Sequence, residues 1–195
     1  MKILNLYAGI GGNRKLWGDE HEVTAIENNP EIAKIYQKFF PNDKVIVCDA
    51  HKYLLEHFKE FDFIWSSPPC PTHSRMRFAL KKARYIDLTL WQEIILLKHN
   101  FKGKWIVENV IPYYTPFIRG TIIGRHMIWS NFNINSFNIK CSTIALATKE
   151  DLARYHGMPI CRRAYLRNCV YPKLGLHIFR CAFKEKHEVL TCSKV

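Results

Sequence analysis

Short apolar runs alternate with amphipathic stretches along the first half of the chain. The runs typical of buried strands lie at residues 2–7, 21–26, 44–48, 61–65 and 104–107. The stretches with helical periodicity lie at residues 31–40, 53–58 and 88–97. Since strand-like and helix-like segments alternate, the pattern predicts a doubly wound α/β domain with a mostly parallel sheet.

The second half follows the same alternation less regularly. We expect a strand over residues 122–132, a turn or short hairpin over 131–140, and helices over 147–154 and 174–183. Thr148 is a candidate N-cap for the first of these helices. We find no repeat, low-complexity region or linker, so the prediction is a single domain over residues 1–195.

The net charge of the chain says more about its partners than its length does. The chain has 195 residues, is 48% hydrophobic and carries a formal net charge of +12. Such an excess of positive charge points to an anionic partner, with nucleic acid as the leading candidate and an anionic membrane surface as the rival. No apolar stretch approaches 18 residues and no signal-peptide layout is present, so we expect a soluble cytoplasmic protein without a membrane partner.

The seven cysteines indicate free thiols. Their number is odd, no CxxC pair occurs, and nothing in the sequence suggests secretion. The histidines show no ligand spacing either. We therefore expect neither a disulfide framework nor a metal site.

A glycine-rich turn follows the first predicted strand. Residues 8–12 read AGIGG and precede a helix-like stretch that reaches about Gly18. A strand that runs into such a turn can cradle a nucleotide, because glycines let backbone N–H groups approach the ligand; a simple tight turn is the alternative. A dinucleotide fingerprint requires a third glycine where this chain has Arg14, which argues against a dinucleotide-dependent oxidoreductase.

Cys70 lies on a stiff turn just after a predicted buried strand, in the stretch FDFIWSSPPCPTHS at residues 61–74. Prolines end that strand, and the carboxyl edge of an α/β sheet is where ligands bind. A free cysteine in a rigid turn is the alternative. Glu27 and Glu108 follow two other predicted strands, where acids satisfied by their neighbours are also common. Residues 72–84 carry five basic residues and no acid, which fits either a loop that closes on phosphates or a solvated face.

In this order, these landmarks resemble the motifs of the cytosine-5 DNA methyltransferase family. The matching segments are LYAGIGG at 6–12, SPPCPTHS at 67–74, ENV at 108–110, GRH at 124–126, TKEDLARYHGMP at 148–159 and RNCVYPKLG at 167–175. Each motif alone is weak, but the ordered set is specific and covers nearly the whole chain. The resemblance implies a Rossmann-like sheet of the S-adenosylmethionine-dependent methyltransferase type.

The resemblance also implies the catalytic residues. Cys70 would add to carbon 6 of a cytosine that is flipped out of the duplex or already single-stranded. Glu108 would meet ring nitrogen 3, and Arg125 would hold the base carbonyl or the glutamate. Nearby arginines would help to deprotonate the thiol. The implied reaction is methyl transfer to carbon 5 of cytosine in DNA.

By the same resemblance the cofactor is S-adenosylmethionine. Tyr7 would stack near the adenine, Glu27 would bind the ribose and Asp49 the adenine amine. The full set of implied cofactor contacts is Tyr7, Gly9, Ile10, Gly11, Gly12, Glu27, Asn28, Asp49, Ala50, Pro69, Asn168 and Val170. The expected nucleic-acid contacts are Ser74, Arg75, Arg77, Arg162 and Arg163.

Three departures from the family pattern bear on substrate choice. Pro71 stands where the family has glutamine, and Thr121 and Ile123 replace a glutamine and an arginine of the arginine motif. Residues 133–147 replace a much larger target-recognition region. We therefore expect weak or very short sequence preference, or a protein partner that supplies recognition. The alternatives are the same chemistry on RNA or a free cytosine nucleotide, and a catalytically weak nucleic-acid-binding protein. So minimal a form suits a bacterial, phage or small mobile-element gene, including a restriction-modification system.

Overall fold

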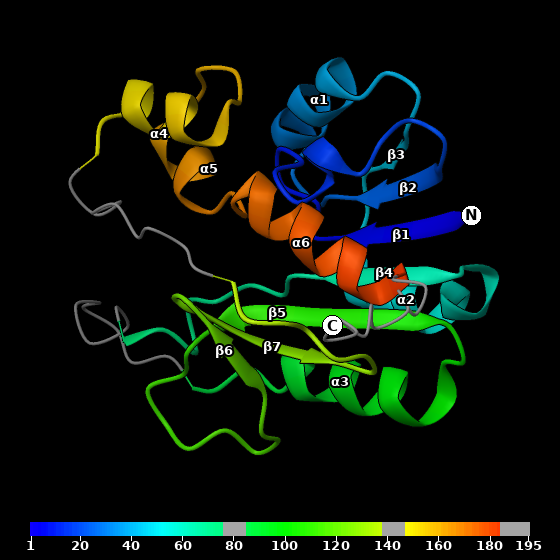
Figure 1. The fold of residues 1–195 in the computed structure, drawn as a ribbon. Coiled ribbons are helices and arrows are strands. Elements are labelled where there is room, and N and C mark those ends of the chain that lie inside the picture. The colour runs from blue at the N-terminus through cyan, green and yellow to red at the C-terminus, as the bar shows by residue number, and fades with distance from the viewer. Residues whose placement is uncertain (76–84, 138–146, 184–195) are drawn as a thin grey trace, which may run out of the picture.

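A computed structural model describes residues 1–75, 85–137 and 147–183. One seven-stranded sheet runs through it in the order β3-β2-β1-β4-β5-β7-β6 (Figure 1). The strands are β1 (Lys2–Leu6), β2 (Glu22–Ile26), β3 (Lys44–Ile46), β4 (Phe63–Ser66), β5 (Lys104–Val110), β6 (Thr121–Ile123) and β7 (His126–Ser130).

The first five strands are parallel and the last pair forms a hairpin. β1 lies between β2 and β4, β5 is parallel to β4, and β7 is antiparallel to both β5 and β6. The order of strands therefore reverses between β1 and β4, which is the switch point where open α/β sheets bind ligands. This confirms the predicted doubly wound α/β class.

Helices cover both faces of the sheet. α2 (Ala50–His57) and α3 (Thr89–Asn100) pack on one face, while α1 (Pro30–Phe39) and α6 (Pro172–Phe183) pack on the other. The remaining elements are η1 (Arg14–Leu16), η2 (Phe58–Glu60), α4 (Lys149–His156) and α5 (Arg163–Arg167). Successive side chains of a strand point to opposite faces of the sheet: Ile64 of β4 faces α3, whereas Phe63 and Trp65 face α6.

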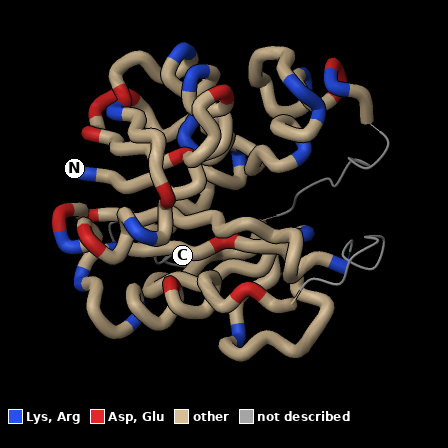
Figure 2. Tube along the Cα trace, turned by 180° about the vertical axis from the view of Figure 1, so that it is seen from behind, with Lys and Arg blue, Asp and Glu red and all other residues tan. Residues whose placement is uncertain are grey.

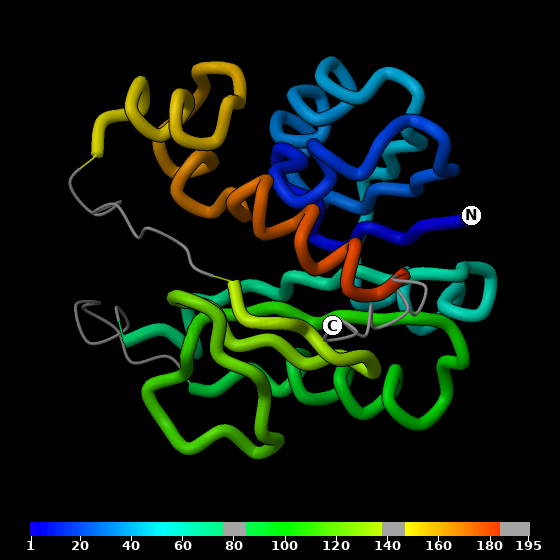
Figure 3. Tube along the Cα trace, in the orientation of Figure 1, coloured from blue at the N-terminus to red at the C-terminus, as the bar shows by residue number. Residues whose placement is uncertain are grey.

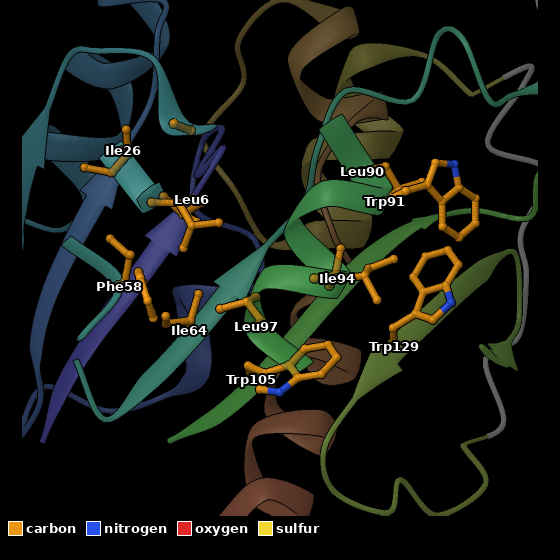
Figure 4. Packing of buried hydrophobic residues seen from close by; sticks show 14 of the residues in the cluster. Leu6, Ile26, Phe58, Ile64, Leu90, Trp91, Ile94, Leu97, Trp105 and Trp129 are labelled. Atoms are coloured by element: carbon orange, nitrogen blue, oxygen red, sulfur yellow. The ribbon is translucent and has the colours of Figure 1, made fainter. Parts of the chain in front are cut away.

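The larger core cluster joins α3 to the sheet (Figure 4). Ile94 and Leu97 of α3 are at most 1% exposed and lie over Ile64 of β4. Trp91 packs edge-on against Trp129 of β7, with ring centroids 5.5 Å apart. Burial of this apolar area fixes α3 beneath the centre of the sheet, and so fixes where the strands end.

Four local predictions were wrong or incomplete. The helix expected after the glycine turn is only the three-residue η1, where the backbone of Asn13 lies so close to α6 that a Cβ at Gly175 would be 2.5 Å from the Asn13 carbonyl oxygen. The strand expected over 122–132 is the β6–β7 hairpin, whose turn at Gly124 has a φ of +59°. β5 continues to Val110, so Glu108 lies inside a strand. Helix α5 was not predicted.

The carboxyl-terminal part of the chain returns to the amino-terminal part (Figure 3). Thr148 caps α4 as predicted, in a reciprocal capping box with Asp151. Lys15 of η1 donates to the carbonyl oxygens of His156 and Gly157 at the end of α4. In the described ranges, no helix is long and apolar enough to cross a membrane.

Candidate active site

Four parallel strands end side by side and place the predicted site residues on one edge. Leu6 of β1 pairs with Ile26 of β2 and with Ser66 of β4, and Ser66 pairs with Val107 of β5. The residues that follow each pair are therefore neighbours. This register brings the glycine turn, Glu27, the Cys70 turn and Glu108 to the carboxyl side of the sheet.

The glycine turn is tied to the end of β2 by Glu27. The Gly9 N–H donates to Glu27 Oε2 at 3.0 Å, and the Asn29 N–H donates to Oε1 at 3.0 Å. Gly11 has a φ of +84°, and a Cβ there would lie 2.2 Å from the ring of Phe40. A carboxylate accepts about four hydrogen bonds, so Glu27 retains acceptor sites for ribose hydroxyls.

Gly12 is held against the carboxyl-terminal segment. A Cβ on Gly12 would lie 2.2 Å from Cys169 Sγ and 2.3 Å from the Val170 carbonyl oxygen. The fold therefore brings together two predicted cofactor residues that are far apart in sequence, Gly12 and Val170. Ile10 is buried in the same cluster as Cys169, and Asn168 is exposed beside it.

The side chain of Tyr7 is hydrogen-bonded to Glu93, a buried carboxylate that was not predicted from the sequence. Glu93 of α3 is fully buried and accepts hydrogen bonds from the hydroxyls of Tyr7 at 2.7 Å and Ser66 at 2.5 Å. The His51 ring lies 3.1 Å from the same carboxylate. Tyr7 also has a φ of +54°, which L residues rarely adopt. The signal in the sequence was one acid among the apolar residues of 88–97.

Asp49, which is predicted to bind the adenine amine, caps helix α2 in the structure. Its Oδ1 accepts from the Lys52 N–H at 2.8 Å and caps α2, while the residue is exposed to solvent. Ala50 is buried and Asn28 is exposed. Glycine backbone at the end of β1 and carboxylates after β2 and β3 fit the amino-acid, ribose and adenine parts of S-adenosylmethionine, so the residues present suit that cofactor.

The Cys70 turn is anchored on both sides. The Cys70 carbonyl oxygen accepts from the N–H groups of His73 and Ser74 at 3.0 and 2.9 Å. The Asn109 side-chain amide donates to the Pro68 carbonyl oxygen at 2.9 Å, which joins this turn to β5. Pro69 is exposed. The thiol is thus held by a rigid turn whose backbone is bonded to the strand that carries Glu108.

The electrostatic environment of Cys70 differs from the expected one. Burial raises the pKa of the thiol, and the negative charge of Glu108 raises it further. The charges of Arg125 and Arg167 lower the pKa as anticipated, but they do not outweigh the first two effects. The resting thiol is therefore protonated at neutral pH, and the arginines help to lower its pKa, as expected, without outweighing burial and Glu108.

Glu108 is buried and paired. It is 7% exposed, and its Oε1 lies 2.5 Å from Nδ1 of His126. Burial raises the pKa of Glu108, but His126, through its positive charge when protonated and through its hydrogen bond, the hydrogen bond of Ser67 and the charge of Arg125 together lower it. The carboxylate is therefore ionised in the resting protein. His126 was not predicted as a site residue.

Arg125 connects this pair to the carboxyl-terminal segment. Its Nε donates to Nε2 of His126 at 3.3 Å, and its terminal nitrogen donates to the Arg167 carbonyl oxygen at 3.4 Å. Thr121 and Ile123, which replace family residues, lie on β6; Thr121 is exposed and Ile123 belongs to the core. Within the arginine motif it is therefore Arg125 that reaches the Cys70 and Glu108 region.

The predicted nucleic-acid contacts separate into two groups. Ser74 and Arg75 follow the Cys70 turn, and Arg77 lies outside the described residues. Arg162 forms an ion pair with Glu31 of α1 at 3.2 Å, and Arg163 donates to the Ala147 carbonyl oxygen at 2.9 Å. Figure 2 shows Lys and Arg at several positions along the α4–α5 segment, together with the acids of the first turn of α4. The basic residues of 147–183 are Lys149, Arg154, Arg162, Arg163, Arg167, Lys173 and Arg180.

The short segment in place of a target-recognition region begins against α6. The His177 ring lies 2.9 Å from the Asn135 carbonyl oxygen and stacks on Phe137 with centroids 4.7 Å apart. Residues 138–146 of this segment lie outside the described part of the chain. No group of three or more potential metal ligands occurs within residues 1–75, 85–137 and 147–183.

Comparisons with known proteins bear on the amino-terminal part of this arrangement, up to residue 113. The family model described as C-5 cytosine-specific DNA methylase matches residues 1–113. No curated protein sequence matches the chain. Among solved structures, a triple mutant of DNMT2 from Spodoptera frugiperda is 25% identical over 56% of this chain and 35% of its own, with a TM-score of 0.41. A hypothetical protein from Thermus thermophilus is 16% identical over 66% of this chain and 73% of its own, with a TM-score of 0.46. The putative methyltransferase yhhF from Escherichia coli is 16% identical over 66% of this chain and 74% of its own, with a TM-score of 0.43.

Proposed function

Because this chain belongs to the C-5 cytosine-specific DNA methylase family, we propose that it methylates carbon 5 of cytosine in DNA through a transient bond to Cys70. The chain is a cytosine-5 methyltransferase and its cofactor is S-adenosylmethionine, which supplies the methyl group as an electrophile. The substrate and the covalent step are the parts that remain proposals.

The observation that carries the proposal is that Cys70 and Glu108 lie at the same sheet edge as the glycine turn, with the Cys70 turn hydrogen-bonded to the strand that carries Glu108. The charge of Glu108 acts on the Cys70 thiol, and Asn109 beside it is bonded to the Cys70 turn. A nucleophile and a carboxylate so placed can meet opposite parts of one pyrimidine ring. The glycine turn follows the neighbouring strand β1.

In the proposed step, Cys70 sulfur forms a bond to carbon 6 and the carbon 5–carbon 6 double bond opens. Electron density moves onto carbon 5 and ring nitrogen 3. The proton that leaves the thiol is accepted by Glu108 and passed to nitrogen 3, so the charge is balanced without another reactant. After carbon 5 has gained the methyl group, its proton passes to water, the carbon–sulfur bond breaks with its electron pair returning to sulfur, and the proton on nitrogen 3 returns through Glu108 to restore the thiol.

The experiment compares four substrates with isotopically labelled S-adenosylmethionine: duplex DNA, single-stranded DNA, RNA and dCMP. We expect 5-methylcytosine in one or both DNA forms. Label found solely in RNA or dCMP would replace the proposed substrate by the corresponding alternative. Label in none of the four would favour a nucleic-acid-binding protein without turnover.

The covalent step has its own test. Fluorine at carbon 5 cannot leave as a proton does, so a 5-fluorocytosine oligonucleotide should trap the protein as an adduct that survives denaturation. Cys70→Ser should form no adduct and no product. As a matched control, Cys48→Ser changes a thiol after β3 that is far along the sheet edge from Glu108, and it should form the adduct normally. Full activity of Cys70→Ser would refute the nucleophile.

A further inference from the structure

We infer that His126 is a positioning residue for the reaction: it receives a hydrogen bond from Arg125 and holds the Glu108 carboxylate ionised and aimed at the substrate base. The inference deepens the proposed function and rests on it. It concerns a residue that the family motifs did not single out, on the first position of β7 next to the turn that carries Arg125.

The hydrogen-bond directions fix the tautomer of His126. Arg125 Nε carries a hydrogen and lies 3.3 Å from His126 Nε2, so Nε2 must act as the acceptor. The ring proton of the neutral imidazole is then on Nδ1, which lies 2.5 Å from Glu108 Oε1 and donates to it. One guanidinium thus orients one imidazole, and that imidazole orients one carboxylate.

Because His126 and Glu108 are both buried, the hydrogen bond between them matters for the charge state of Glu108. The side chains of His126 and Glu108 are each 9% exposed, so water contributes little to solvating the carboxylate. Without a donor, a buried carboxylate tends to take up a proton. The other groups that face Glu108 are the Ser67 hydroxyl at the end of β4, the Arg125 guanidinium and the Cys70 thiol.

The proton balance of the proposed step explains why this matters. The productive form holds one proton between Cys70 and Glu108, whichever of the two carries it. When Glu108 is protonated as well as the thiol, no group can accept the thiol proton. The acid limb of the pH–rate profile therefore reports the pKa of Glu108, and His126 should keep that limb at low pH.

The test uses three variants of the full chain. His126→Leu removes the donor, and kcat at neutral pH should fall about 10- to 100-fold, less than the 10²–10⁴ typical of removing a general acid or base itself. KM for the nucleic acid should change little. The acid limb should move up by about one pH unit. Unchanged kcat and an unmoved acid limb would overturn the inference.

Two isosteric amides keep the test decisive where the leucine variant fails to fold. His126→Asn places an amide donor near the position of Nδ1, and it should restore most of kcat and the position of the acid limb. His126→Gln places the same amide near Nε2, where Arg125 donates, and should restore neither. Equal behaviour of the two variants would contradict the assigned geometry.

A measurement without substrate or cofactor separates this inference from the proposed function. In protein labelled with ¹³C at the glutamate carboxyl, the Glu108 signal is identified by its loss in Glu108→Gln. Its titration midpoint should rise in His126→Leu and in His126→Gln but not in His126→Asn. If no substrate is methylated yet these shifts occur, the proposed function fails and the pairing stands; if the midpoint never moves, the inference fails whatever the activity.

Discussion

The cofactor half and the catalytic half of the site are held in different ways. At the ends of β1 and β2, the glycine turn is fixed by backbone contacts: Gly9 N–H to Glu27, and Gly12 against the Val170 backbone. At the end of β5 and in the β6–β7 turn, charged side chains hold one another, as in the Arg125–His126–Glu108 chain. Substitutions that add volume should therefore disturb the cofactor half most, and substitutions that remove a charge or a proton should disturb the catalytic half most.

The largest expected effect comes from a substitution that disturbs the catalytic half alone. Glu108→Gln keeps the size of the side chain but cannot relay a proton, so kcat should fall about 10³-fold, or about 4 kcal/mol. Binding of S-adenosylhomocysteine, measured by calorimetry, should change less than twofold because Glu27 and the glycine turn are untouched. A variant that retains more than a tenth of kcat would exclude Glu108 as a proton carrier.

The cofactor half contains a buried ion pair, and breaking it should destabilise the domain. Arg14 Nε donates to Asp43 Oδ2 at 2.9 Å, both side chains are at most 3% exposed, and the Tyr36 hydroxyl donates to the same carboxylate. Arg14→Met leaves a buried charge unpaired and should cost about 3 kcal/mol in urea unfolding.

The control for that prediction is the double variant Arg14→Met with Asp43→Asn. The asparagine still accepts from Tyr36 but carries no charge. The double variant should be more stable than Arg14→Met alone. If it is less stable, unpaired charge is not the reason for the loss.

Two glycines of the same turn provide a sharper comparison. A Cβ on Gly12 would collide with Cys169 and with backbone of Val170, so Gly12→Ala should cost about 2–3 kcal/mol and weaken cofactor binding. Gly9 has a φ of +56°, but a Cβ there would approach nothing closer than the Tyr7 carbonyl oxygen at 4.0 Å, so Gly9→Ala should cost about 1 kcal/mol. Thermal unfolding measures both. Equal losses would show that backbone strain, not volume, limits this turn.

A further small effect is a pH dependence centred on His156, between the two halves. Its side chain is buried, neither ring nitrogen meets a hydrogen-bond partner among the described residues, and burial followed by the charges of Arg125 and Lys15 lowers its pKa to about 4. The folded protein thus favours the neutral ring. The stability this provides is complete above the unfolded-state pKa of about 6.5 and is lost as the pH falls toward about 4.

His156→Leu should remove that dependence. Between pH 7 and pH 5 the wild-type protein should lose about 1–2 kcal/mol more of its unfolding free energy than the variant does. Urea unfolding at both pH values measures the difference. Parallel losses in the two proteins would show that another group titrates in this range.

Much of the fold was predictable because the apolar periodicity of each strand and helix is a local property. Spacing within a few residues was enough to predict the strands before and after α1, the helix α3 and the cap at Thr148. The hairpin of β6 and β7 was read as one strand, since a two-residue turn at Gly124 leaves little trace in an apolar run. Helix α5 was missed because five residues are too few for a periodic signal.

The sequence by itself determined the residue types and the order of the motifs: a glycine turn, a thiol after a proline-bounded strand, a glutamate and an arginine. Spacing along a chain carries that much, since each motif is local. Only the tertiary structure decided that Glu93 lies beneath Tyr7, that Gly12 meets Val170, and that His126 joins Arg125 to Glu108. Those contacts join residues from separate elements, and only the register of the strands and the packing of helices on the sheet bring them within hydrogen-bond reach.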